Sequence, residues 1–158
     1  ENHPVVRVDW CDARAYCKWA GKRLCGRIGG GANHYSDYAD AALSEWHNAC
    51  ATGGTKSYPY GSSYEGMACN GSDNGAGASL PVGSKPKCEG GHPGLFDLSG
   101  NVLEWEDSCN ETAGSQDLCR YRGGSFLDDA SSLACGDGSG VGDRSFKGAG
   151  VGFRCCGD

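Results

Sequence analysis

The sequence predicts a loop-rich α+β domain stapled by disulfides, and three observations lead to this fold class. The chain has 158 residues, a length that suits a single domain. It contains 28 glycines, which favour many turns and irregular loops over long regular elements. It also contains 11 cysteines, more than a cytosolic chain of this size usually carries. We therefore predict one domain over residues 1–158, with short helices and small antiparallel sheets.

A first helix is predicted over residues 10–20. Asp9 and Asp12 have the spacing of a capping box, apolar residues follow at helical spacing, and Gly21 stands where a helix commonly ends. A second short helix is predicted over residues 40–50. Short strands are predicted at residues 5–8, 80–83, 102–105, 120–126 and 151–156.

The charge and the hydropathy of the chain argue against binding to nucleic acid or anionic membranes and against insertion into a membrane. The net charge is −6 and no block of Lys or Arg occurs, which weighs against nucleic acid and anionic membrane surfaces. No apolar run approaches the roughly 20 residues that a membrane-spanning helix needs, so no membrane insertion is expected. The tryptophans are expected in the core rather than on the surface: Trp10, Trp19, Trp46 and Trp105.

The cysteines are interpreted as disulfides rather than zinc ligands. Zinc sites favour paired short spacings such as Cys-x-x-Cys, and the sequence has none. Disulfides persist in oxidising compartments, so we expect an extracellular, periplasmic or cell-surface protein. Spacings of 6 (Cys11–Cys17), 10 (Cys109–Cys119) and 19 (Cys50–Cys69) are typical of disulfides. Cys109–Cys119 is the favoured local pair, and Cys69–Cys88 is a further candidate. Because the count is odd, at least one cysteine is free or pairs outside this chain.

A series of motifs runs in one order along nearly the whole chain. Its members are the stretches 8–13 and 15–24, Ser44-Glu45-Trp46, Tyr58-Pro59-Tyr60-Gly61 followed by Cys69-Asn70, Pro81-Val82-Gly83, the stretch 94–105, Arg122-Gly123-Gly124-Ser125-Phe126 and Gly152-Phe153-Arg154-Cys155. Together they resemble the formylglycine-generating-enzyme, or sulfatase-modifying-factor, family.

The resemblance implies a fold and two disulfides. The family fold is similar to a C-type-lectin-like domain, with irregular loops around small twisted sheets. Domains of the family usually begin several tens of residues earlier, so an N-terminal portion is expected to be missing or to lie outside this chain. The resemblance pairs Cys17 with Cys155 and Cys50 with Cys135. Cys11, Cys25 and Cys156 are left to share one bridge and one free thiol.

A calcium site is expected between Asp97 and Glu104. The two carboxylates are hard oxygen ligands, Gly100 permits a tight turn, and calcium takes 6–8 oxygens in flexible geometry. The resemblance implies that the side chains of Asp97 and Glu104 bind the ion together with the main-chain carbonyls of Leu98, Gly100 and Val102. The alternative is a plain turn with solvated acids.

A second calcium site is expected to begin at Asn70 with the carbonyl of Gly71, because the family has a site that starts this way. The downstream half of that site is shortened here. Asp73 or Asn74 could complete it.

The positions that carry catalysis in the family are altered. Its enzymes oxidise a substrate cysteine to formylglycine with oxygen, and they bind copper(I) through two cysteines. These lie three and eight positions after the Ser of Arg-Gly-Gly-Ser, here Ser125, and soft thiolates suit copper(I). The residues at these positions are Asp128 and Leu133. We therefore expect no copper, no formylglycine formation and no catalytic residue.

Three hypotheses follow. The leading one is a secreted, calcium-stabilised binding or structural module for an unknown protein or glycan, with a polar ligand surface in residues 126–149 that includes Asp128, Asp129 and Arg144. The second is a copper-dependent oxidase, or a related oxidoreductase, that uses Cys135 with another thiol such as Cys156. The third is a subunit of a surface assembly.

Overall fold

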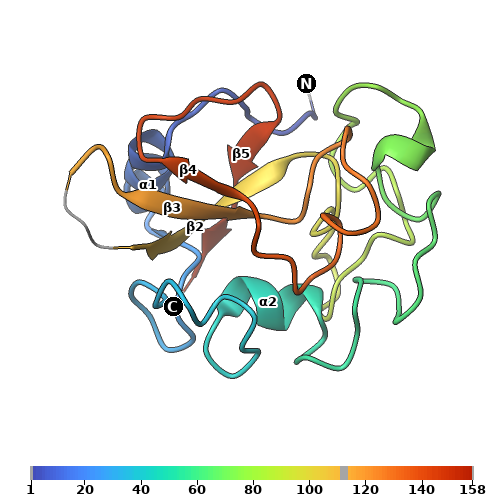
Figure 1. Ribbon diagram of the computed structural model, residues 1–158, viewed down its shortest axis with the longest axis horizontal. Coiled ribbons are helices and arrows are strands. Elements are labelled where there is room, and N and C mark those ends of the chain that lie inside the picture. The colour runs from blue at the N-terminus through green and yellow to red at the C-terminus, as the bar shows by residue number, and fades with distance from the viewer. Residues whose placement is uncertain (1, 111–113, 158) are drawn as a thin grey trace.

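The computed structural model describes residues 2–110 and 114–157, in which short elements are joined by long loops (Figure 1). This confirms the loop-rich α+β fold class. In chain order the elements are α1 (Trp10–Trp19), β1 (Arg23–Leu24), α2 (Glu45–Cys50), a 3₁₀ turn (Ser72–Asn74), β2 (Leu103–Cys109), β3 (Leu118–Arg122), β4 (Val141–Asp143), β5 (Val151–Phe153) and β6 (Cys155–Cys156).

The main sheet has four strands in the order β4-β3-β2-β5, and a second sheet pairs β1 with β6. The neighbours β4-β3 and β3-β2 are antiparallel, whereas β2 and β5 are parallel. The predicted antiparallel pairing therefore holds for three of the described strand pairs, and the pair β2-β5 departs from it. A parallel pair needs a long connection, and the segment between β2 and β5, which contains β3 and β4, supplies it.

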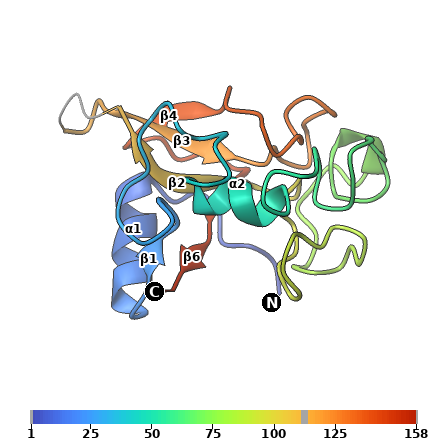
Figure 2. The same ribbon diagram turned by 90° about the horizontal axis from the view of Figure 1, so that it is seen from below.

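The two sheets and α1 form one end of the molecule (Figure 2). β3 and β4 lie on one side of β2, and α1, β1 and β6 lie on the other. The segment from about residue 50 to 100 forms the opposite end as loops, apart from the 3₁₀ turn. None of the helices in the described part of the chain has the length and apolar character required to cross a membrane.

Helix α1 begins as predicted. Asp9 accepts a hydrogen bond from the amide of Asp12 at 2.7 Å, and the Asp12 carboxylate accepts one in return from the Asp9 amide. The buried face carries Trp10, Ala13 and Cys17, which pack in the core with Trp105. This face is narrow because only residues spaced by three or four share it.

Trp19 lies off that face and is 79% exposed, so the expectation that it belongs to the core was wrong. It follows Cys17 by two residues, which turns it away from the buried side of the helix. The other three tryptophans are buried, as expected.

Helix α2 is shorter than the predicted span of 40–50. Residues 40–43 form turns, and Ser44 caps the helix by accepting a hydrogen bond from the His47 amide at 3.1 Å. Trp46 and Cys50 are buried on α2 and form a second core cluster with Leu98.

Two of the predicted strands are absent and the other three have different bounds. The strand predicted at residues 102–105 is β2, Leu103–Cys109. Residues 5–8 and 80–83 are extended or turned segments without ladder partners. The predicted strand 120–126 ends at Arg122 because Gly123 and Gly124 take left-handed conformations, with φ of 90° and 67°. The predicted strand 151–156 is divided at Arg154 into β5 and β6.

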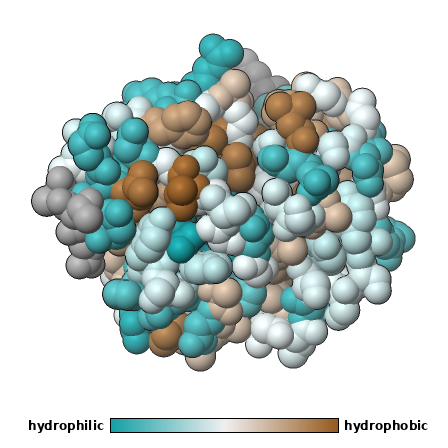
Figure 3. All heavy atoms as spheres, in the orientation of Figure 1, coloured by the Kyte–Doolittle hydropathy of each residue, from teal (hydrophilic) through white to brown (hydrophobic). Residues whose placement is uncertain are grey.

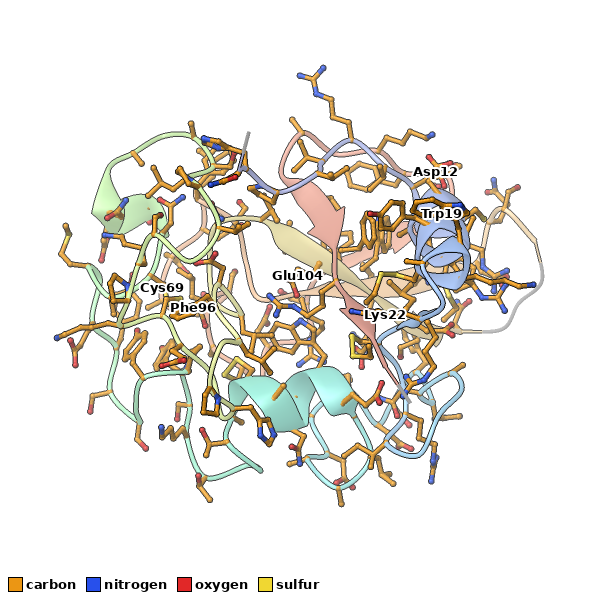
Figure 4. All side chains as sticks on the ribbon, turned by 180° about the vertical axis from the view of Figure 1, so that it is seen from behind. Asp12, Trp19, Lys22, Cys69, Phe96 and Glu104 are labelled. Atoms are coloured by element: carbon orange, nitrogen blue, oxygen red, sulfur yellow. A yellow bond between two sulfur atoms is a disulfide. The ribbon has the colours of Figure 1, made fainter. Side chains whose placement is uncertain are left out.

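Five disulfides cross-link the chain, and their sulfur–sulfur bonds are drawn in yellow in Figure 4. Four of them join the cysteines that were paired in the sequence analysis: Cys17–Cys155, Cys50–Cys135, Cys69–Cys88 and Cys109–Cys119. The fifth is Cys25–Cys156, which leaves Cys11, exposed on α1, as the one free cysteine among the described residues. This number of disulfides indicates a non-cytosolic protein.

Candidate metal and ligand site

The segment from Asp97 to Glu104 forms a tight loop, here called the curl, which leads into the first residues of β2. Asp97, Gly100 and Asn101 all adopt left-handed conformations, with φ of 62°, 72° and 65°. Such conformations are uncommon for residues other than glycine and persist where the surroundings fix them. Asn101 is fixed in this way, because its Oδ1 accepts hydrogen bonds from the Leu80 amide at 2.8 Å and from Asn70 Nδ2 at 3.1 Å.

The Glu104 carboxylate is buried at the base of this curl, and Figure 4 shows the residue near the middle of the molecule. Arg154 binds it as a fork, with Nε to Oε2 and Nη2 to Oε1 both at 2.5 Å. Trp46 Nε1 also donates to Oε2, at 2.8 Å. Both oxygens of Glu104 therefore already have partners, and its charge is balanced by the guanidinium.

The Asp97 carboxylate is 8% exposed and has weaker support. Its Oδ2 accepts a hydrogen bond from the Gly83 amide at 2.8 Å. Burial raises the pKa of Asp97 above its ordinary value, and the negative charge of nearby Glu104 raises it further, against the Gly83 hydrogen bond. Because Arg154 already balances Glu104, Asp97 is the acid of this pair that a further cation would stabilise most.

The main-chain carbonyls of the curl complete the set of oxygens. Leu98, Gly100 and Val102 are buried. Outside the strand ladders, no backbone amide of the described residues donates to any of these three carbonyls. Carbonyls that accept no such hydrogen bond are available as ligands for a cation. The oxygens present therefore fit calcium, which accepts carboxylates and main-chain carbonyls together.

The described residues contain no group of three or more His, Cys, Asp or Glu side chains that could hold a metal. A calcium ion at residues 97–104 would therefore depend on the carbonyls for most of its ligands. Most ligands of the ion would thus be neutral main-chain oxygens rather than carboxylates.

The side chain of Asn70, the start of the second expected calcium site, is fully engaged in hydrogen bonds. Its Nδ2 donates to Ala78 O at 3.0 Å and to Asn101, and its Oδ1 accepts from Asn74 Nδ2 at 3.0 Å. Asp73 instead forms a hydrogen bond with Tyr64. The structure therefore brings Asn74, rather than Asp73, to the Asn70 side chain.

The two positions that would carry copper thiols have structural roles. Asp128 Oδ2 accepts hydrogen bonds from the amide and the hydroxyl of Ser125, both at 2.7 Å, and so closes the turn after Arg-Gly-Gly-Ser. Leu133 is 2% exposed, and its methyl groups pack against the backbones of Gly71 and Gly100. Cys135, the nearest cysteine in sequence, is bonded to Cys50.

The residues of the expected ligand surface do not form one hydrogen-bonded group. Asp129 is exposed and binds Ser131, with its Oδ1 accepting from the Ser131 hydroxyl at 2.6 Å. Arg144 stacks over Trp10, 4.5 Å from the ring centre, and pairs with Asp117 at 2.7 Å. No hydrogen bond or ion pair within residues 2–110 and 114–157 joins Arg144 to Asp128 or Asp129.

Sequence reasoning assigned no role to Arg154 or to the Trp46 indole, although both bind Glu104. A signal for Arg154 was available. A buried carboxylate requires a cation or several donors, and Arg154 belongs to the motif 152–155 that carries part of the family resemblance. The Trp46 contact had no sequence signal, because it depends on how α2 packs against β2.

Comparisons with known proteins identify the family. Residues 1–158 match the model described as "Sulfatase-modifying factor enzyme 1-like domain". The "Inactive C-alpha-formylglycine-generating enzyme 2" of Bos taurus is 35% identical over 143 residues, covering 83% of this chain and 41% of that protein. The "Formylglycine-generating enzyme" of Mus musculus is 33% identical over 118 residues, covering 66% of this chain and 27% of that protein. The chain thus spans less than half the length of these relatives.

Solved structures share the fold over almost all of the chain. PvdO from Pseudomonas aeruginosa superposes with a TM-score of 0.67 at 23% identity, covering 96% of this chain and 60% of that one. The Treponema denticola variable protein 1 gives a TM-score of 0.67 at 19% identity, covering 96% of this chain and 70% of that one. With its fold and its full-length match to the family model, this chain belongs to the sulfatase-modifying factor enzyme 1-like family.

Proposed function

We propose that this chain is a non-catalytic binding or structural module of its family, stabilised by calcium and placed in an extracellular, periplasmic or cell-surface setting. The observation that carries the proposal is the use of Asp128 and Leu133. One closes a turn and the other fills the core, where an oxidase of this family needs two thiols. The relative with 35% identity, which carries the name "Inactive C-alpha-formylglycine-generating enzyme 2", supports the same proposal.

Formylglycine formation is expected to be absent. The test incubates the protein and copper(I) with a Cys-x-Pro-x-Arg peptide in air, and the peptide is examined by mass spectrometry for the loss that accompanies conversion of cysteine to formylglycine. The Streptomyces coelicolor formylglycine-generating enzyme, 34% identical over 120 residues, serves as the positive control. Conversion of the peptide by this chain above the copper-only background would overturn the proposal.

The number of accessible thiols separates this module from an oxidase. Cys11 is the one free cysteine that the structure describes, and both Cys135 and Cys156 are in disulfides. Alkylation under non-reducing, denaturing conditions is therefore expected to label one thiol per chain. An oxidase built on Cys135 and Cys156 requires at least two.

Calcium is expected to raise the melting temperature, because a ligand that binds only the folded state adds stability. The gain is about 2.7 kcal/mol in the free energy of unfolding when calcium is at about 100 times its dissociation constant. Scanning calorimetry with excess calcium and with excess chelator measures the difference. Asp97→Asn keeps an acceptor for the Gly83 amide but removes the charge, so most of the difference should disappear in this variant. Asp129→Asn, at an exposed acid outside the curl, should retain it.

Identical melting curves in calcium and in chelator would remove calcium from the proposal while leaving the non-catalytic module in place. The second site, at Asn70 and the carbonyl of Gly71, belongs to the same proposal. Because the Asn70 side chain already has protein partners, it would bind calcium only by exchanging the hydrogen bond from Asn74. The ligand of the module, a protein or a glycan, is proposed to contact the surface of residues 126–149, which includes Asp128, Asp129 and Arg144.

A further inference from the structure

A cavity of about 480 Å³ lies over the curl of residues 97–104. Its volume falls within the range of small-molecule sites, roughly 300–1,000 Å³. Asp97, Glu104 and Arg154 lie among its lining residues and form a polar floor. Most of the wall is apolar and is contributed by Pro4, Val5, Tyr16, Val82, Phe96 and Phe153.

The rim of this cavity is unusually apolar for a surface. Val5, Tyr16 and Val82 are 63%, 53% and 55% exposed, and Tyr16 makes an edge contact with Phe153 at 5.5 Å between ring centres. By contrast, on the face drawn in Figure 3 the hydrophobic residues form small, separate groups among hydrophilic ones. Apolar side chains gathered around one hollow mark a place where a molecule with an apolar body can leave water.

One polar group of the floor has no protein partner. Arg154 uses Nε and Nη2 for Glu104, and Nη2 also donates to Phe96 O at 2.9 Å. Its remaining nitrogen, Nη1, makes no hydrogen bond with any described residue, yet it is not one of their buried unpartnered atoms. Nη1 therefore keeps some exposed surface, and Arg154 is one of the residues that line the cavity. The fork with Glu104 holds the guanidinium in place, so little side-chain freedom is lost when Nη1 binds a ligand.

The charge of the floor decides which ligand it suits. Asp97 and Glu104 are negative and Arg154 is positive, so the three groups together carry one negative charge. A calcium ion in the curl changes the sum to one positive charge. A ligand with a single negative charge then complements both the loaded floor and the open Nη1, since a carboxylate accepts a charge-assisted hydrogen bond from a guanidinium.

We propose that this cavity binds an amphipathic carboxylate, a molecule with an apolar or aromatic body and one carboxylate group, when calcium occupies the curl. The body lies against Tyr16, Phe96 and Phe153, and the carboxylate meets Arg154 Nη1. The inference rests on the calcium part of the proposed function. It adds a ligand class and a place that are separate from the surface of residues 126–149.

Three probes test the proposal: 4-phenylbutyrate, 4-phenylbutanol and 4-phenylbutylamine. They have the same phenyl group and four-carbon chain and differ only in the terminal polar group. Titration calorimetry in calcium is expected to show that the butyrate binds about tenfold or more tightly than the alcohol, as a hydrogen bond to a charged group implies, with the amine weakest. In chelator the preference for the butyrate should disappear. Equal binding of all three probes in calcium, or tightest binding of the amine, would overturn the proposal.

Two surface variants provide a matched pair. Val82→Asp places a negative charge at the rim and is expected to weaken butyrate binding about tenfold. Met67→Asp makes the same change at a residue that is 65% exposed and does not line the cavity, so butyrate binding should be unchanged. Equal effects of the two variants would contradict a site in this cavity.

Calcium binding to the same samples, measured by titration without the probes, separates the two possible failures. Calcium binding without butyrate binding refutes the cavity site alone. If calcium does not bind, the calcium part of the proposed function fails, and the cavity proposal fails with it.

Discussion

Removal of both disulfides that tie the C-terminus to the first fifth of the chain is expected to cost about 7–8 kcal/mol of unfolding free energy on the chain-entropy account. These bridges are Cys17–Cys155 and Cys25–Cys156, with sequence separations of 138 and 131. Closing a loop of that size is worth about 5 kcal/mol. Since both bridges close nearly the same loop, either one alone keeps it closed.

The loss of a single bridge of this pair therefore opens only a short loop and should cost about 2–3 kcal/mol. Urea unfolding of three alanine variants measures this: Cys17→Ala with Cys155→Ala, Cys25→Ala with Cys156→Ala, and all four together. The fourfold variant is expected to lose more than the sum of the other two, and enough to be largely unfolded, given a typical stability of about 5–15 kcal/mol.

The local disulfide Cys109–Cys119 is the control. Its sequence separation is 10 and no other cysteine lies inside its loop, so its loss should cost about 2–3 kcal/mol and add to either single removal. If the fourfold variant loses no more than the sum of its two parts, the shared-loop explanation is wrong.

Substitution of Arg122 by Met is expected to destabilise the fold by about 3–5 kcal/mol, because it leaves a buried carboxylate without its cation. Arg122 and Glu106 are both fully buried, with Nη1 and Oε2 3.2 Å apart. The guanidinium also donates to the carbonyls of Tyr38, Cys135 and Asp137 at 2.7–2.9 Å. Thermal and urea unfolding measure the loss.

The Arg122→Met variant should also acquire a characteristic pH dependence. Burial raises the pKa of Glu106, and the charge of Arg122 opposes this rise, so removing Arg122 raises the pKa further. A carboxyl whose pKa is higher in the folded than in the unfolded state binds more protons when folded. The free energy of unfolding of the variant should therefore fall as the pH increases above the ordinary glutamate value of 4.5.

Two further variants test whether the loss of stability comes from the unpaired, buried charge of Glu106. Arg23 and Glu45 form a partly exposed pair, with side chains 22% and 16% exposed, so Arg23→Gln should cost no more than about 1 kcal/mol. The double variant Arg122→Met with Glu106→Leu removes both charges and should regain part of the loss, since no unpaired carboxylate remains. A loss in Arg122→Met that does not depend on pH would show that the hydrogen bonds to carbonyls, rather than the charge of Glu106, dominate.

Local chemistry in the sequence was sufficient for several elements. The Asp9 and Asp12 capping pair located the start of α1, because both partners lie within one turn of each other. The glycine content and the 11 cysteines predicted a loop-rich, disulfide-stapled fold. The resemblance to the family places two thiols three and eight positions after Ser125, and the sequence has Asp128 and Leu133 there.

Other features depend on contacts between distant residues. The strand expected at residues 5–8 is absent, because Arg7 takes a left-handed conformation and its amide binds carbonyls of the distant residues 148 and 151. The parallel pairing of β2 with β5 depends on the path of the long segment between them. The exposure of Trp19 depends on which face of α1 meets the core.

The sequence by itself determined the family and the loop-rich class. Residue types carry both, because the family motifs run in order along the chain and the glycines and cysteines set the class. The lost thiol pair and the calcium ligands followed from the resemblance to the family, and calcium remains a prediction. Only the tertiary structure decided that Cys25 pairs with Cys156, that Arg154 and Trp46 bind Glu104, and that a cavity with an open guanidinium nitrogen lies above the curl. These features join residues from tens to more than a hundred positions apart, so only the packed chain brings them together.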